Sequence, residues 1–421
     1  MEKIELLEKQ AESGNVDSII EIANLAIDNN YDKEKAIEYL LSINEKMNPE
    51  AYYCLYELYE QKSILDTDNI ALETSQKYLY MSAELGFETA YWTIAGESDG
   101  EKNYEKAILY IQKLIEKNNG DAMIEMAHYY KDGRGVEQSF EKAFEYYNKA
   151  LSIGCTGAYV GLGIAYLNGE GVEQNIDEAI KCFEKAIEYN HADAFNNMGF
   201  LYYYGEGVEQ DYEKAFQYYI KGAEGGFEIS QYKVGCMYRD GIGVKQDLGK
   251  AFNWLKKATE QYFYKAFNDI GNLYEHGEGT EQNYDLALES FNDAIFWAEA
   301  NDKILPTAYY NVGRLYFDGK GVEINYKKAL EHFNIAIKNS HLSTMKETTK
   351  EDCIKYKTKI EGLKLAFEEN DISRVALQSK LSIGFPLASE VFDWLKEQKY
   401  IDKDGKTILT KEEYEKLFSE V

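Results

Sequence analysis

The sequence predicts an all-α protein: an α-solenoid of about nine helix-pair repeats, followed by a small C-terminal domain. Two observations lead to this fold class. Hydrophobic residues make up 45% of the 421 residues and only 3 residues are proline, as expected for a globular helical chain. In addition, a unit of 36 residues recurs until about residue 340, and a period of this length is typical of stacked helical repeats.

Six clear copies of the unit follow one another. They begin at Ala122, Ala158, Ala194, Ser230, Ala266 and Ala308. A six-residue insertion that contains Pro306 precedes the last copy. Before the insertion, one glycine of each copy recurs every 36 residues, at Gly135, Gly171, Gly207, Gly243 and Gly279. The corresponding glycine after the insertion is Gly321. Degraded copies precede residue 122, and we count nine units between about Gly14 and Ser340.

Each copy predicts two helices joined by a tight turn. In the copy that starts at Ala158, small and apolar residues lie at helical spacing, and Gly163 lies among them. Glycine costs a helix about 1 kcal/mol relative to alanine, so its recurrence here predicts a closely approaching helix. A G-x-G turn then ends the helix, because glycine adopts the left-handed conformation. The second helix presents Ala179, Phe183 and Ala186 on one face, which stacked neighbours would bury in a continuous core.

The segment from Ala158 to Ala186, AYVGLGIAYLNGEGVEQNIDEAIKCFEKA, resembles the Sel1-like repeat family, a relative of the tetratricopeptide repeats. The resemblance covers about residues 14–340. It implies a right-handed superhelix of antiparallel helix pairs that hosts protein partners. One aromatic position of the repeat is expected to pack between helices, and it holds Tyr166, Tyr202, Tyr238, Tyr274 and Tyr316.

The repeat pattern ends at residue 340, which divides the chain into a solenoid over 1–340, a connecting segment or capping helix over 341–357, and a domain over 358–421. Within the last domain we expect a helix over 359–369 and then a helix, a turn and a second helix. Pro386 suits the first turn of that second helix. A hairpin with Gly405 at its tip follows.

This domain resembles the winged-helix gamma domain of the FtsK and SpoIIIE DNA translocases. The resemblance rests on Leu377-Gln378, Ile383-Gly384-Phe385, Ala388, Leu395-Lys396 and Tyr400-Ile401. It implies DNA contact through the second helix, where that family has Asn-Arg. Here Pro386-Leu387 stands at that place, Ser389 and Glu390 follow, and no arginine is present for phosphates or bases. The departure favours a role in protein contact or in structure.

Charge and side-chain chemistry narrow the function further. The net charge is −28, and residues 1–340 hold 32 Lys and Arg against 58 Asp and Glu, which repels nucleic acid and anionic membranes. The five cysteines form no CxxC motif, and no HExxH or calcium-loop pattern occurs. No signal peptide and no apolar stretch of membrane-spanning length is apparent. We therefore expect a cytoplasmic protein without enzymatic activity, catalytic residues, metal or cofactor.

Exposed positions on the first helix of each pair face the inner, concave surface in related solenoids. Carried over through the aligned glycines, these candidate partner-binding residues are His128, Lys131, Asn196, Tyr203, Tyr232, Arg239, Asn268, Asn272, His276, Tyr310 and Arg314. Asparagine can pair with both groups of a peptide backbone, and tyrosine and arginine are enriched at interfaces. The outer face and the ends of the solenoid remain alternatives.

These observations predict a cytoplasmic scaffold or adaptor that binds a protein or peptide on the concave face, with no small-molecule substrate. The alternative from another class is a DNA-associated regulator, in which the C-terminal winged helix contacts DNA while the repeats sense a partner. A hydrolase is the outlying third reading. The adaptor interpretation rests largely on the family resemblance.

Overall fold

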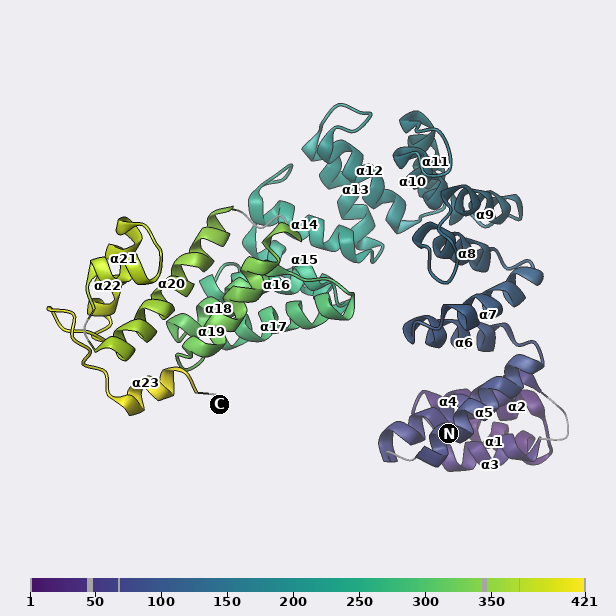
Figure 1. The fold of residues 1–421 in the computed structure, drawn as a ribbon. Coiled ribbons are helices and arrows are strands. Elements are labelled where there is room, and N and C mark those ends of the chain that lie inside the picture. The colour runs from purple at the N-terminus through teal and green to yellow at the C-terminus, as the bar shows by residue number, and fades with distance from the viewer. Residues whose placement is uncertain (1, 44–47, 67–68, 343–346, 371, 420–421) are drawn as a thin grey trace. The chain divides into compact units, whose positions relative to one another are not determined.

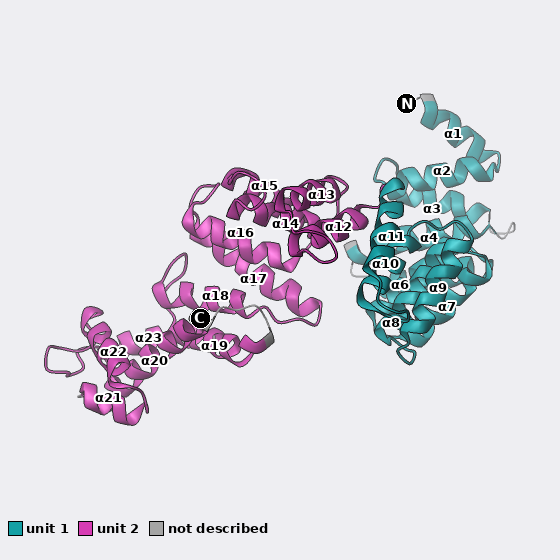
Figure 2. Cartoon of the chain, turned by 90° about the horizontal axis from the view of Figure 1, so that it is seen from above, with its two compact units in different colours: residues 1–189 teal, residues 190–421 magenta. Residues whose placement is uncertain are grey.

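A computed structural model describes residues 2–43, 48–66, 69–342, 347–370 and 372–419. Regular structure in these ranges is helical, apart from one isolated antiparallel bridge between Ile401 and Thr407. The chain divides into two compact units, unit 1 at residues 1–189 and unit 2 at residues 190–421 (Figure 2). The all-α solenoid fold is thus confirmed.

Unit 1 consists of short helices that follow one another closely (Figure 1). They are α1 (Glu2–Glu12), α2 (Val16–Ile27), α3 (Lys33–Ser42), α4 (Pro49–Asp66), α5 (Asn69–Glu84), α6 (Glu88–Gly100), α7 (Tyr104–Glu116), α8 (Gly120–Asp132), α9 (Phe140–Ser152), α10 (Ala158–Asn168) and α11 (Ile176–Glu188).

Unit 2 continues the pattern. Its repeat helices are α12 (Ala192–Tyr204), α13 (Tyr212–Glu224), α14 (Glu228–Asp240), α15 (Leu248–Glu260), α16 (Tyr264–His276), α17 (Tyr284–Ala300), α18 (Pro306–Asp318) and α19 (Tyr326–Lys338). A short 3₁₀ helix, η2 (Ser340–Leu342), α20 (Glu347–Glu369), α21 (Arg374–Lys380), α22 (Phe385–Glu397) and α23 (Lys411–Leu417) follow. From α2/α3 to α18/α19, the described helices form the nine pairs that the sequence predicts.

Glycine ends the first helix of each clear repeat, as predicted. The C-caps of α8, α10, α12, α14, α16 and α18 are glycines in the left-handed conformation, with φ between 68° and 74°. At Gly171, the second glycine of one turn, a Cβ atom would lie 2.2 Å from the carbonyl oxygen of Phe140 in the preceding repeat. The G-x-G turn therefore also lets one repeat approach the next.

In five of the six clear repeats, from α10 to α18, a glycine inside the first helix makes room for the second helix of the same pair. A Cβ atom on Gly163 would lie 2.5 Å from the ring of Phe183 on α11. The same contact recurs between Gly199 and Tyr219 and between Gly271 and Phe291. Phe183 is fully buried, as are the two alanines that share its face. This confirms the predicted close helix approach, and it explains why glycine is used despite its low helix propensity.

The repeated tyrosines pack between helices, as predicted, although they are only partly buried. The ring of Tyr166 packs edge-on against Phe144 of the preceding repeat at 5.5 Å, and Tyr238 and Tyr274 make equivalent contacts. The hydroxyl end stays at the surface, where that of Tyr202 accepts a 2.6 Å hydrogen bond from a lysine ammonium. An amphipathic ring can thus pack between helices while its polar end meets solvent.

The insertion that contains Pro306 lengthens the helix that precedes it, α17. Helix α17 has 17 residues, whereas the other second helices from α9 to α19 have 13. The rest of the insertion forms the turn that leads into α18, where Asp302 adopts a left-handed φ of 53°. Ile304 and Leu305 of this turn and Thr307 of α18 line a groove with residues of α12, α14 and α16.

The C-terminal segment folds onto the last repeat. Helix α20 runs without a break across the expected boundary at 357/358, so the predicted connecting segment is in large part helical. Its Tyr356 stacks on Phe333 of α19 at 5.2 Å. Trp394 of α22 stacks on Phe317 of α18 at 5.4 Å. These aromatic contacts belong to one continuous core, so the segment after residue 340 also closes the end of the repeat array.

Helix α21, the turn, helix α22 and the hairpin tip lie where the sequence predicts them. Pro386 lies in the first turn of α22. The backbone N–H of Ile408 donates to the carbonyl oxygen of Tyr400, and that of Asp402 donates to Lys406. Gly405 at the tip has φ of 96°, and a Cβ atom there would lie 2.0 Å from the carbonyl oxygen of Ile372. Only glycine fits this turn.

Candidate functional site

A groove of about 580 Å³ lies on one face of unit 2, between the first helices of consecutive repeats. Its lining residues come from the end of α12, from α14, from α16, from the turn before α18 and from the first turn of α18. These helices are labelled in Figure 1. They are Tyr204, Tyr232, Lys233, Tyr264, Lys265, Asn268, Asp269, Ile304, Leu305 and Thr307. The residues combine aromatic rings with polar groups, as binding grooves commonly do.

Aromatic residues build one wall of the groove. The ring of Tyr232 lies 5.1 Å from that of Phe263, and the ring of Tyr264 lies 5.8 Å from the same phenylalanine. Burial raises the pKa of the Tyr232 phenol well above its usual value, and the nearby carboxylate of Asp269 adds to this. Tyr232 therefore stays neutral, and its hydroxyl can both donate and accept hydrogen bonds.

Neighbouring side chains of unit 2 bind the carboxylate of Asp269, which lines the groove. An Arg239 guanidinium nitrogen donates to Oδ2 of Asp269 at 2.8 Å, and the side-chain amide of Asn268 donates to Oδ1 at 3.3 Å. The side chain of Asp269 is 14% exposed. Arg239 also pairs with Asp240. Two predicted partner-binding residues, Asn268 and Arg239, thus hold a third residue in place.

A ladder of asparagines joins α16 to α18. The side-chain amide of Asn311 donates to the Oδ1 atoms of Asn268 at 3.1 Å and of Asn272 at 3.4 Å. Asn311 and Asn268 are both buried. Buried amides are stable when their hydrogen bonds are made, and the ladder connects one repeat with the next. The asparagines therefore have partners within the chain, besides any that a bound peptide would supply.

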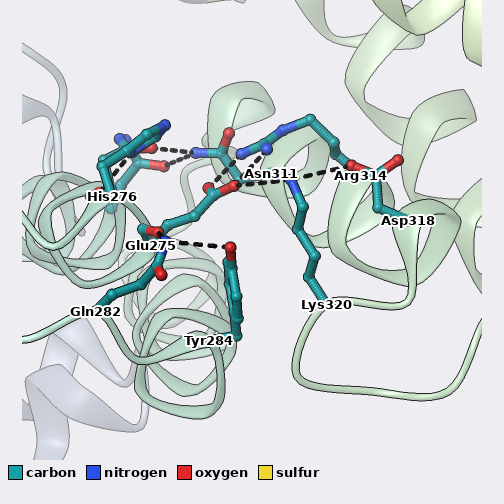
Figure 3. A network of polar contacts seen from close by, with 10 residues as sticks. Glu275, His276, Gln282, Tyr284, Asn311, Arg314, Asp318 and Lys320 are labelled. Atoms are coloured by element: carbon teal, nitrogen blue, oxygen red, sulfur yellow. Dashed lines mark hydrogen bonds and ion pairs between the residues drawn. The ribbon is translucent and has the colours of Figure 1, made fainter.

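The ion pair between Arg314 and Glu275 lies beside this ladder (Figure 3). Both guanidinium NH groups of Arg314 donate to the two carboxylate oxygens, and Glu275 is only 3% exposed. Burial opposes ionisation of Glu275, but the hydrogen bonds and charge of Arg314, with further charges from His276 and Lys320, outweigh it. The pKa of Glu275 accordingly lies below its usual value. Arg314 is thus already committed to a bidentate contact.

The remaining predicted residues of unit 2 lie on the same series of first helices. The amide oxygen of Asn196 accepts a 3.3 Å hydrogen bond from Ser230. Tyr203 packs against Tyr212 and Tyr219, and Tyr310 lies under the guanidinium of Arg314 at 5.9 Å. His276 is exposed, and its Nδ1 lies 2.9 Å from the carbonyl oxygen of Asn272.

Two predicted residues belong to unit 1. Nδ1 of His128 lies 3.3 Å from the carboxylate of Glu125, whose pKa is lowered chiefly by this contact. The ring of His128 packs edge-on against Tyr147 at 6.0 Å. Lys131 is partly buried near the end of α8. These two residues are described with unit 1 alone and are no part of the groove in unit 2.

Two of the eleven predicted residues, Tyr232 and Asn268, line the groove. Sequence reasoning missed Lys233, Lys265 and the insertion residues. One signal pointed to the insertion residues, namely the insertion itself, which breaks an otherwise constant period. No sequence pattern connects the two lysines. The partner-binding role of all eleven residues stays a prediction.

Among the described residues, no group of three His, Cys, Asp or Glu side chains is placed to hold a metal ion. No helix in the described ranges combines the length and the apolar character that a membrane crossing requires.

The chain matches the Sel1 repeat model in seven segments, at residues 83–119, 120–155, 157–191, 192–227, 229–263, 268–289 and 306–341, which together make up more than half of its length. A Sel1 repeat protein from Oxalobacter formigenes is 29% identical in sequence, with a TM-score of 0.50. The alignment covers 58% of this chain and 98% of that protein.

Two further solved structures are more distant. A protective antigen of uropathogenic Escherichia coli with an SLR fold, c5321, is 19% identical over 94% of this chain and 90% of its own, with a TM-score of 0.43. The immunity protein Pa5087 of Pseudomonas aeruginosa is 18% identical over 57% and 81%, with a TM-score of 0.36. No curated protein matches the chain. The seven matched segments and the helix pairs that they form show that this chain belongs to the Sel1 repeat family.

Proposed function

We propose that this protein is an interaction scaffold whose unit 2 holds an extended segment of a partner protein in the groove between α12, α14, α16 and α18. Sel1 repeats are generally scaffolds for protein–protein interaction, which supports the class of function. The observation that carries the proposal is the groove itself: it is lined by residues of three consecutive first helices and by the insertion. Tyrosine and asparagine side chains in it suit contact with a peptide.

The rigidity of the groove also supports this function. The asparagine ladder and the Arg314–Glu275 pair fix α16 against α18, so the groove does not need to be ordered when a partner binds. Preorganisation lowers the entropic cost of association. Arg314 and Asn272 thereby contribute to partner binding through the position of the wall, in addition to any direct contact.

The alternative, DNA contact by the C-terminal segment, has weaker support. Glu390 of α22 pairs with Lys359 at 3.3 Å, and Asp393 pairs with Arg374 at 2.6 Å. The helix that would enter a groove of DNA thus presents two carboxylates, each paired with a cation, and carries no arginine for phosphates or bases. A role of this segment in closing the repeat array requires no such contact.

The scaffold function is tested by filling the groove. Thr307→Trp places an indole among the lining residues, and Glu289→Trp, on an exposed position of α17, is the matched control. Each variant and the wild type serve as bait in lysate of the source cell, and proteins retained by the wild type are quantified and then purified for titration. The proposal expects a partner that binds the wild type and the control but binds Thr307→Trp at least tenfold more weakly. Equal binding to all three chains contradicts it.

A further inference from the structure

Three lysines gather at the groove, and none of them forms an ion pair with a described carboxylate. The Nζ atoms of Lys265 and Lys303 lie 5.9 Å and 5.7 Å from the ring centroid of the same tyrosine, Tyr264. Lys233 lies 5.7 Å from the ring of Tyr203. Lys233 and Lys265 line the groove directly, and Lys303 adjoins its lining residues in the insertion. Helices α14 and α16 and the insertion before α18 thus bring ammonium groups to one place.

The ammonium groups of this cluster form no close ion pairs within the described part of the chain, although Asp302 is the sequence neighbour of Lys303. Among the ion pairs formed by the described residues, none includes one of the three lysines. The single carboxylate that lines the groove, Asp269, is already bound by Arg239 at 2.8 Å. The chain as a whole carries a net charge of −28, so a local positive patch is the exception on its surface. Such a patch in a negative surround attracts and orients anionic ligands.

Repulsion between the three ammonium groups also favours the binding of an anion. Burial lowers the pKa of Lys265, and the charges of Lys233 and Lys303 lower it further, while Asp269 opposes this only in part. Bringing like charges together costs free energy, and an anion that enters the groove would relieve that cost. The aromatic rings beside the ammonium groups leave room for cation–π contacts but supply no countercharge.

We infer that the groove selects a partner segment rich in aspartate and glutamate, whose carboxylates meet Lys233, Lys265 and Lys303. This inference names the class of partner and rests on the proposed scaffold function. An acidic protein segment fits better than nucleic acid, because the acidic groups of unit 2 outside the groove would repel a long phosphate backbone. A short carboxylate-bearing segment presents its charge only where the lysines lie.

The probes are two synthetic peptides of ten residues, labelled at one end and titrated against the full chain. One carries six glutamates separated by glycine and leucine, and the other replaces each glutamate by glutamine. We expect binding of the acidic peptide that weakens as salt rises, because screening reduces exposed charge pairs. The glutamine peptide should bind at least tenfold more weakly. Equal binding of both peptides, or binding of neither, overturns the inference.

Variants locate the interaction. The triple variant Lys233→Gln, Lys265→Gln, Lys303→Gln should lose at least tenfold in affinity for the acidic peptide. Lys256→Gln, an exposed lysine of α15 that does not line the groove, should leave the affinity unchanged. In a ¹³C-methylated chain, bound acidic peptide should also raise the pKa of Lys265, an effect that a merely structural lysine would not show. If the triple variant binds as tightly as the wild type, the inference is wrong.

Two further arms separate this inference from the scaffold function. A single-stranded oligonucleotide of ten bases is titrated in parallel, and tighter binding of it than of the acidic peptide overturns the acidic-segment assignment. The partner found with Thr307→Trp is then tested against the triple lysine variant. Loss of binding to both variants supports both proposals. Loss with Thr307→Trp alone leaves the scaffold function standing and contradicts the acidic partner.

Discussion

The hydroxyl groups of Tyr326, in the last repeat helix α19, and Tyr400, in the C-terminal hairpin, share a buried hydrogen bond of 2.7 Å. Burial raises the pKa of the Tyr326 phenol far above its usual value, and the contact with Tyr400 adds to the shift. The two residues are 74 positions apart in sequence. The bond therefore joins the C-terminal segment to the solenoid at the centre of their common core.

A double-mutant cycle on this pair tests the connection. Tyr400→Phe leaves the Tyr326 hydroxyl buried without its partner, which should lower the free energy of unfolding by about 1–3 kcal/mol. The double variant Tyr326→Phe, Tyr400→Phe should cost less than the sum of the single changes, because it leaves neither hydroxyl unpaired. Urea unfolding of the four chains gives the coupling energy. Tyr212→Phe, at a 40% exposed tyrosine, is the control and should change little. Strictly additive losses would contradict a shared bond.

Loss of Arg314 should destabilise unit 2 strongly. Arg314→Met keeps much of the side-chain volume but leaves the 3% exposed Glu275 carboxylate without its bidentate partner. Breaking a buried ion pair from one side typically costs about 3–5 kcal/mol. Hydrogen exchange of the amides of α16 and α18 measures the local loss. Lys320→Met removes a more distant charge, 3.9 Å from Glu275, and should cost much less. Comparable losses in both variants would show that the bidentate contact has no special role.

The same pair predicts an acid-sensitive contact between repeats. The pKa of Glu275 is lowered in the folded chain, so the unfolded state binds a proton more readily. Stability from this group is complete above the unfolded pKa of about 4.3 and is lost as the pH falls through the lower folded value. Exchange protection of α16 and α18 should therefore decline below about pH 4.3. In Glu275→Gln this decline should be smaller, and an unchanged pH profile would contradict the assignment.

Replacing the helix glycines by alanine should have opposite effects at two positions of unit 1. A Cβ atom on Gly163 would meet the Phe183 ring at 2.5 Å, so Gly163→Ala should destabilise the unit by about 1–3 kcal/mol. Gly96, in the first helix α6, has no atom within 4 Å of the Cβ position. Gly96→Ala should instead stabilise by up to about 1 kcal/mol, because alanine is the better helix former. Thermal unfolding of both variants and of the wild type measures these changes in stability. A stabilised Gly163→Ala chain would refute the close helix contact.

The repeat architecture could be predicted from sequence because each copy contains the residues that end its helices and pack them together. The G-x-G turn, the helix glycine opposite Phe183 and the alanines beside it recur at a fixed step, and local conformation follows from them. The C-terminal order of helix, turn, helix and hairpin could likewise be predicted, because it follows from residues close together in sequence. That α20 continues through residue 357 could not be predicted from local sequence, because it depends on the packing of Tyr356 against the last repeat.

The candidate site was predicted only in part, for a physical reason. A repeat alignment places a residue on a face but does not tell whether its side chain is already bound. Arg314 pairs with Glu275, 39 positions earlier, and Asn311 of α18 donates a hydrogen bond to Asn268 of α16. The lysine cluster escaped the alignment for another reason. Lys233 and Lys265 occupy different positions of their repeats, and Lys303 lies in the insertion, so no periodic pattern connects them.

The measurement that tests the account most directly is site-specific photo-crosslinking in the source cell. A photoreactive phenylalanine analogue replaces Thr307 in the groove or Glu289 on the exposed face of α17. The account predicts that Thr307 crosslinks to one partner protein, that Glu289 does not, and that the Lys233, Lys265, Lys303 triple variant reduces the crosslink. Equal crosslinking from the two positions, or none from Thr307 while the partner still co-purifies with the chain, would contradict a binding groove in unit 2.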